Sequence, residues 1–168
     1  MLHMTSRIGG MLHDDHLATL RALEDLDELL ERQGDAPPDL SKGAARDVLT
    51  AMTGIVRDEV GRHFGFEEEH LFPVLRAAGQ AGMTQLLISE HRAILPAAEA
   101  AGTLAVQALA AGAFEPAAWR DFAEHAREFV EREMFHIQKE EMGLLAAIAA
   151  LVGPDDDARL AETFKALA

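Results

Sequence analysis

The sequence carries the same pairing of an imidazole and a carboxylate twice. His63 is followed four residues later by Glu67, and His136, which lies 73 residues further along the chain, is followed four residues later by Glu140. Residues four apart share one face of an α-helix, so the ring and the carboxylate of each copy project together above a run of apolar residues. The repetition indicates a buried polar pair that the fold uses twice.

A single histidine precedes each of these pairs on another apolar helical pattern. His16 lies 47 residues before His63, and His91 lies 45 residues before His136. A helical wheel places His16 near the middle of its apolar stripe. The chain is therefore interpreted as two helix pairs, each of which carries one lone histidine and one His-x-x-x-Glu motif.

Buried carboxylates at these positions would need compensation by positive charge. Burying an unpaired carboxylate costs several kcal/mol, and Arg132 is the best-placed inward cation in the pattern. A divalent or trivalent metal would satisfy the glutamates and histidines together. Because the chain has no cysteine, the ligands would be nitrogen and oxygen, which suit iron, manganese or zinc, and two shared carboxylates suit a dinuclear iron centre. With two six-coordinate metals, about two positions would stay open, which indicates chemistry or gas binding.

Four long amphipathic helices are expected to position these residues. The expected ranges are 6–33, 41–78, 83–111 and 116–152, with Ser41 as the N-cap of the second helix and a short fifth helix from about 155 to 167. Pro73 should kink the second helix or end it early, because it lacks a backbone donor. Short connections predict an all-α, antiparallel up-down-up-down four-helix bundle, formed by one domain over residues 1–168.

Composition and charge exclude several classes of partner. The formal net charge of −14 would repel nucleic acids and anionic lipids, so we expect neither as a partner. The apolar run from Met142 to Gly153 is too short to cross a bilayer, and the amino terminus has no signal-peptide pattern. We expect a cytoplasmic protein, and the sequence allows a homodimer.

At these residues the chain resembles the hemerythrin-like family, also called the HHE cation-binding domain. The resemblance covers most of the chain, and its motifs are Asp14-Asp15-His16, His63-Phe-x-x-Glu67-Glu68 with Leu71-Phe72-Pro73, Glu90-His91, and His136-Ile-x-Lys-Glu140-Glu141. The resemblance implies a hemerythrin-like bundle in which two iron ions form an oxo- or hydroxo-bridged centre. It implies reversible binding of O2, or related chemistry with NO or peroxide. The implied iron ligands are His16, His63, Glu67, His91, His136 and Glu140, with Glu67 and Glu140 bridging.

Two positions depart from the oxygen-carrying members of that family. Those proteins place a second histidine four residues after the ligand of the third helix, where this chain has Leu95. One iron would then have an extra open position unless His13, Glu59 or another nearby group fills it. The carriers also take the last carboxylate five residues after its histidine, which would be Glu141. A four-residue step turns only about 40° from the ligand direction and a five-residue step about 140°, so helix geometry favours Glu140.

The sequence leaves several functions open. The first is a non-heme di-iron protein that binds O2, NO or peroxide for sensing, storage or detoxification. The second is a di-iron oxidoreductase that turns over peroxide or NO, which the opening at Leu95 favours. The third is a metal-free or zinc-filled helical interaction module, and manganese is another substitute for iron.

A ferritin-like interpretation would use Glu67-x-x-His70 and Glu133-x-x-His136. It is disfavoured because the 73-residue repeat duplicates neither pair. His70 and Glu59 nevertheless face roughly the ligand side of their helix, so both remain candidates for a role at or near the metals.

Overall fold

The computed structural model describes residues 6–168, apart from the side chains of residues 59 and 60, so the expectation for the Glu59 side chain lies outside the described part. Within this part the chain forms helices and contains no β-strand. The α-helices are α1 (Arg7–Gln33), α2 (Gly43–Asp58), α3 (Phe64–Phe66), α4 (Phe72–Ala77), α5 (Ala81–Ala111), α6 (Pro116–Lys139), α7 (Leu145–Leu151) and α8 (Pro154–Ala166). Three π-helical segments join some of them, namely η1 (Glu59–His63), η2 (Glu67–Leu71) and η3 (Glu140–Leu144).

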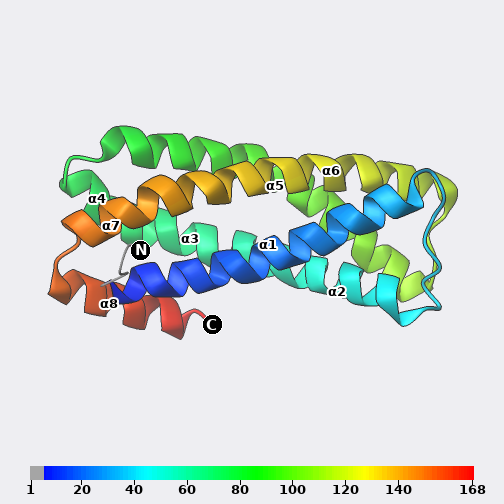
Figure 1. Ribbon diagram of the computed structural model, residues 1–168, viewed down its shortest axis with the longest axis horizontal. Coiled ribbons are helices and arrows are strands. Elements are labelled where there is room, and N and C mark those ends of the chain that lie inside the picture. Colours follow the sequence, from blue (N-terminus) through cyan, green and yellow to red (C-terminus); the bar gives the residue numbers. More distant parts are fainter. Residues whose placement is uncertain (1–5) are drawn as a thin grey trace.

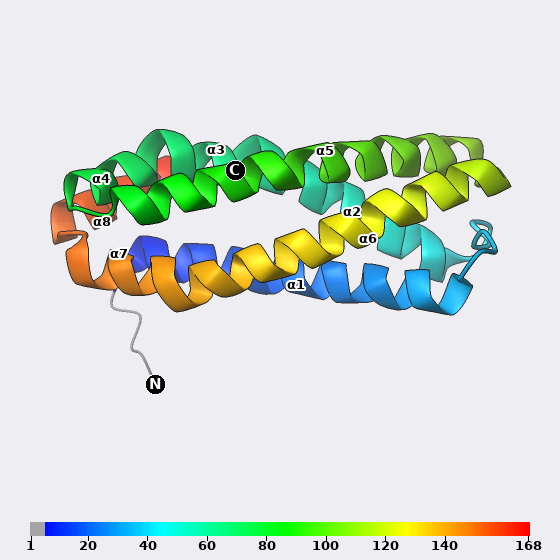
Figure 2. The ribbon, with the colours of Figure 1, turned by 90° about the horizontal axis from the view of Figure 1, so that it is seen from above.

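Four long helical segments pack lengthwise into a bundle (Figure 1). Helix α1 packs against α2 and α6, and α5 packs against the same two helices. The view from above shows the same arrangement (Figure 2). The short helix α8 packs against α1. The predictions of an all-α helical bundle and of a short last helix are therefore confirmed.

The second and fourth long segments are helical throughout but are not uniform α-helices. Residues 43–77 and 116–151 run without a non-helical residue, and the π-helical segments interrupt their α-helical geometry. Three residues singled out by the sequence, His63, Glu67 and Glu140, each lie in a π-helical segment. A π turn takes in one extra residue and often marks a functional site. Its wider turn changes the direction of the side chains that follow.

Two expected local features differ in the structure. Ser41 is not the N-cap of α2, which begins at Gly43, because its hydroxyl instead donates to Asp39 Oδ1 at 2.5 Å. Pro73 does not end the second segment. It lies in the first turn of α4, directly after η2, where a missing backbone donor is tolerated.

The buried side chains form two hydrophobic clusters. The larger cluster contains Trp119, Phe122 and Phe129 and extends along α1, α2, α5 and α6. The smaller cluster lies where α1 begins and includes residues of α4, α7 and α8. Trp119 also ties α6 to the end of α1, since its Nε1–H donates to the carbonyl of Gly34 at 3.0 Å.

One helix, α5, is long and apolar enough by length and composition to cross a membrane. In the bundle, its buried residues pack against α2 and α6. A core helix of a folded bundle passes the same test of length and composition.

The contact between α8 and the start of α1 gives a testable prediction. Asp157 accepts hydrogen bonds from Ser6 Oγ at 2.6 Å and from the backbone N–H groups of Arg7 and Ile8, so it caps a helix from the other end of the sequence. Asp157→Ala should lower the free energy of unfolding by about 1 kcal/mol. Urea unfolding would measure the loss. Asp156→Ala is the control, because Asp156 pairs only locally with Arg159, and an equal loss in both variants would contradict the assignment.

Candidate metal centre

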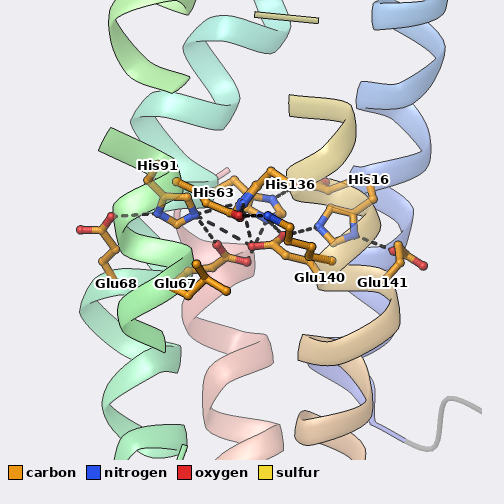
Figure 3. A network of polar contacts seen from close by, with 12 residues as sticks. His16, His63, Glu67, Glu68, His91, His136, Glu140 and Glu141 are labelled. Atoms are coloured by element: carbon orange, nitrogen blue, oxygen red, sulfur yellow. Dashed lines mark hydrogen bonds and ion pairs between the residues drawn. The ribbon is translucent and has the colours of Figure 1, made fainter. Parts of the chain in front are cut away.

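All six residues predicted from the spacing meet in the interior of the bundle (Figure 3). Each is at most 1% exposed, and together they come from all four long segments. They lie between the two hydrophobic clusters. The six residues are His16 on α1, His63 and Glu67 on the second segment, His91 on α5, and His136 and Glu140 on the fourth segment.

The donor atoms fall into two overlapping groups. Within each group, one donor atom from each residue lies within 4.8 Å of the others. Both glutamates belong to both groups, which is the arrangement that two neighbouring ions sharing two carboxylates would require. One group is His16, His63, Glu67 and Glu140, and the other is Glu67, His91, His136 and Glu140.

Glu140 spans two histidines from opposite sides of the cluster. Its Oε2 lies 2.9 Å from His16 Nε2, and its Oε1 lies 2.9 Å from His136 Nε2. The prediction that Glu140, rather than Glu141, faces the other inward groups agrees with this geometry. Glu141 lies outside the cluster, where its Oε1 is 2.6 Å from His16 Nδ1.

Glu67 spans the other two histidines in the same way. Its Oε1 lies 3.1 Å from His63 Nε2, and its Oε2 lies 3.2 Å from His91 Nε2. The Phe64 ring stacks on the His91 ring, with centroids 3.9 Å apart and planes 8° apart. This packing fixes the plane in which His91 presents its inner nitrogen.

An outer ring of four carboxylates contacts the Nδ1 atoms of the histidines. Each acid comes from a neighbouring long segment, so four contacts link the segments around the bundle. In the sequence, each acid is also the immediate neighbour of one of the six inward residues. The pairs are His16 with Glu141 at 2.6 Å, His63 with Asp15 at 3.4 Å, His91 with Glu68 at 2.8 Å and His136 with Glu90 at 2.8 Å.

The outer ring fixes which nitrogen of each ring faces inward as an acceptor. A carboxylate accepts hydrogen bonds, so the Nδ1 beside it carries the proton, and a neutral ring then presents an Nε2 lone pair. Inside the cluster these lone pairs face carboxylate oxygens, and His91 Nε2 lies only 3.1 Å from His136 Nε2. Acceptors that face acceptors in a dry interior need protons or a cation between them. The donor set therefore fits metal ions.

When no metal is bound, protons on the histidines separate the facing acceptor atoms of the cluster. Burial opposes charging of the rings, but Glu140 and Glu67 outweigh it and raise the pKa of His91 and of His136 to about 9. Burial likewise opposes ionisation of Glu140, yet the pairing with His136 holds the pKa of this carboxyl well below its usual range. The cluster thus retains the Glu140 carboxylate as an anion, and its protonated histidines must release protons when it takes up metal.

The expected inward arginine lies elsewhere. Arg132 is half exposed, and its Nε donates to Glu128 Oε1 at 2.9 Å on the outer surface of α6. Its expected inward position is therefore wrong. Arg62 donates to Asp15 at 2.7 Å and so supports the outer ring. The charge that compensates the inner carboxylates comes from the histidines in the metal-free protein.

The remaining candidates lie outside the cluster. The side chain of His13 is 38% exposed and its Nδ1 lies 2.9 Å from Glu141 Oε2, which places it at the rim. The side chain of His70 is 36% exposed and packs near Phe66. Leu95 is partly buried against the larger hydrophobic cluster and has no donor atom for a metal.

Sequence analysis missed one feature of the site and one buried carboxylate on α6. The first is the outer ring, whose signal was visible as an acidic residue beside each lone histidine and each inward glutamate. The second is Glu133, which is fully buried on α6, one turn before His136. It was considered only as half of a ferritin-like pair, and its burial could not be read from spacing alone.

Comparison with known proteins identifies one family. The family model for the hemerythrin HHE cation-binding domain matches residues 8–148 of the 168-residue chain. No curated protein matches the chain. The matched range includes all six inward residues and all four carboxylates of the outer ring.

The raised pKa values predict how the stability of the metal-free protein depends on pH. Because His91 and His136 have folded-state pKa values of about 9, above the ordinary 6.5, their stabilising effect is complete below pH 6.5 and is lost as pH rises through 9. The loss should be of order a few kcal/mol. Thermal unfolding of chelator-treated protein across this range would measure it. His70→Gln should leave the slope unchanged, and stability that rises with pH would contradict the prediction.

Proposed function

The chain belongs to the hemerythrin HHE cation-binding domain family, and we propose that it is a non-heme di-iron protein that binds O2, NO or peroxide. The observation that carries this proposal is the convergence of four inward Nε2 atoms on two shared, fully buried carboxylates. A site built only for stability would not need acceptors to face one another. The physiological role would be sensing, storage or detoxification.

The donor set assigns each residue a place at the proposed centre. His16 and His63 would hold one iron, His91 and His136 would hold the other, and Glu67 and Glu140 would bridge both. Imidazole and carboxylate without thiolate suit iron, while manganese and zinc remain substitutes. When bound, two iron ions would supply redox chemistry and a position open to a small ligand.

The chain's own residues would tune this centre. The outer carboxylates orient the imidazoles and make them better donors. The hydrophobic clusters on the two sides limit access of water to the bound ligand. Leu95 offers no donor atom, so a metal held on its side of the cluster would keep a position for a small ligand, which supports ligand binding and turnover alike.

The proposal extends to the architecture and location. We infer an up-down-up-down order of the four long segments, formed by a single domain over residues 1–168. Support comes from pairs of contacts along α1: Gly9 approaches Ile148, His16 contacts Glu140, and Gly34 accepts from Trp119. Later residues of α1 thus contact earlier residues of the fourth segment, so these two segments run antiparallel. A cytoplasmic location, a lack of nucleic-acid or membrane partners, and a homodimer remain proposals from the sequence.

A second candidate function is turnover of peroxide or NO by the same centre. It is favoured by a surface cavity of about 550 Å³ that is lined by Glu90, His136 and Lys139, among others. Lys139 contacts Glu90, and Glu90 contacts His136 Nδ1 at 2.8 Å. These contacts therefore form a polar path from the cavity to the cluster. A small reductant could approach through the cavity.

Removal of one shared carboxylate should abolish the centre. Glu67→Ala should reduce iron from about two ions per chain to well below one, because both groups lose a donor. Elemental analysis after anaerobic loading with Fe(II) would measure the loss. Glu69→Ala is the matched control, since the neighbouring Glu69 side chain is 75% exposed. Full iron content in the Glu67 variant would contradict the proposed ligand set, and wild-type protein that takes up zinc but no iron would favour the helical interaction module.

Cycling the gas phase should separate binding from turnover. Iron-loaded protein moved between air and argon should show a reversible change in its absorption spectrum, with about one O2 taken up per centre. Steady consumption of peroxide or NO with a reductant, lost in Glu67→Ala, would instead support the oxidoreductase. An iron-loaded spectrum that responds to neither O2, NO nor peroxide would refute ligand binding.

A further inference from the structure

The last helix, α8, covers one side of the metal centre. It lies against the start of α1 (Figure 1), and near its first turn Asp157 accepts a hydrogen bond from Ser6 Oγ at 2.6 Å. Near its other end, Phe164 reaches the second long segment at His63. The family match ends at residue 148, so α8 lies outside the matched range and yet contacts an inward histidine.

Phe164 packs directly against the His63 imidazole. Its side chain is 2% exposed, and its ring lies at right angles to the His63 ring, with centroids 6.2 Å apart and planes 89° apart. The Phe66 ring lies on another side of it, with a centroid distance of 4.8 Å. An aromatic side chain of α8 thus fills the space beside the half of the cluster that contains His63.

Arg62 and Asp15 extend this cover over His63. The Arg62 Cζ atom lies 4.7 Å from the centre of the Phe164 ring, where a guanidinium is attracted to the aromatic face. Arg62 also donates to Asp15 Oδ2 at 2.7 Å, and the same oxygen lies 3.4 Å from His63 Nδ1. Contacts from α8, the second segment and α1 therefore meet over one histidine.

The surface on this side does not reach the cluster. A cavity of about 410 Å³ lies beside the end of α8 and is lined by Arg62 and Leu167, among others. Within the described part of the chain, its lining includes none of the six inward residues. Phe164 and Arg62 separate this cavity from His63, since Phe164 is buried between them.

The opposite side of the centre is different. The cavity of about 550 Å³ between α5 and α6 is lined by His136 itself, together with Glu90 and Lys139. Leu95, which provides no donor atom, lies one turn along α5 from His91. The half of the cluster with His91 and His136 thus has both a cavity beside it and fewer potential donors.

We propose that Phe164 controls access to the metal centre by closing the side at His16 and His63, so that external molecules enter from the side at His136. This inference rests on the proposed di-iron function and deepens it, because it names the iron held by His91 and His136 as the one that a small ligand reaches. Phe164 acts by exclusion and contacts no reacting atom.

Covalent labelling of the metal-free protein tests the closure without requiring iron. Diethyl pyrocarbonate modifies neutral imidazole nitrogens, and peptide mass spectrometry would give the labelling rate of each inward histidine in the wild type, Phe164→Ala and Phe164→Leu. His91 and His136 are internal references, because they are as buried as His16 and His63. Circular dichroism would verify that the variants fold.

The effect should be confined to one half of the cluster. Phe164→Ala should raise the labelling rates of His16 and His63 at least about tenfold, because local opening becomes easier on that side. Phe164→Leu keeps much of the side-chain volume and should raise the same two rates by a smaller factor. The rates of His91 and His136 should change by less than about twofold.

A matched variant separates closure from general stability. Phe114→Ala also removes a buried phenyl ring, but from the larger hydrophobic cluster, and it should leave the ratio of the His63 rate to the His136 rate unchanged. A purely structural role of Phe164 would accelerate the labelling of all four inward histidines equally. Such equal acceleration, or unchanged rates in both Phe164 variants, would overturn the inference.

Azide binding tests the entry side in iron-loaded protein. Ala93 is exposed and lines the cavity beside His136, so Ala93→Trp should fill this cavity and slow azide binding to the oxidised centre at least about tenfold. Val106→Trp is the control, because Val106 is exposed on the same helix but lines a different cavity. An unchanged azide rate in Ala93→Trp would overturn the entry side. Wild-type protein that takes up no iron would overturn the di-iron function, whereas the labelling result would still decide the closure by Phe164.

Discussion

Two fully buried carboxylates, shared between four histidines, set the conditions that the rest of the structure must meet. Glu67 and Glu140 have no access to water, and a buried anion is tolerated only beside compensating positive charge. The inward Nε2 atoms can provide this charge as imidazolium groups or can bind cations as neutral rings. The same cluster is therefore stable with protons and suited to metal. Metal uptake at this site is necessarily an exchange of ions for protons.

The outer ring of carboxylates links the charge balance of the cluster to the packing of the four long segments. Asp15, Glu68, Glu90 and Glu141 each hold a histidine of a neighbouring segment, so every adjacent pair of long segments is linked once at the level of the cluster. The two hydrophobic clusters then pack on either side of this polar layer. A charge lost from the ring would alter both the orientation of an imidazole and a contact between helices. Site geometry and bundle geometry are thus not independent.

The sequence predicted the features that follow from helical periodicity. Apolar spacing defined the long helices, and the repeated His-x-x-x-Glu spacing identified the inward residues, because residues four apart must share a face. Periodicity could not reveal the π-helical segments, which depend on how a helix adapts to its neighbours at His63, Glu67 and Glu140. It also could not decide the inward or outward position of charged residues near the edge of the stripe. Arg132 was expected inside but lies on the surface, while Glu133 is completely buried.

The central claim is that the six converging side chains hold two metal ions inside the bundle. Anomalous diffraction at the iron edge, from crystals of protein loaded anaerobically with Fe(II), tests this claim most directly. The account predicts two anomalous peaks about 3.5–4 Å apart, each within bonding distance of two Nε2 atoms and both near Glu67 and Glu140. A dry cluster without anomalous signal, or iron bound only to acidic groups on the surface, would contradict it.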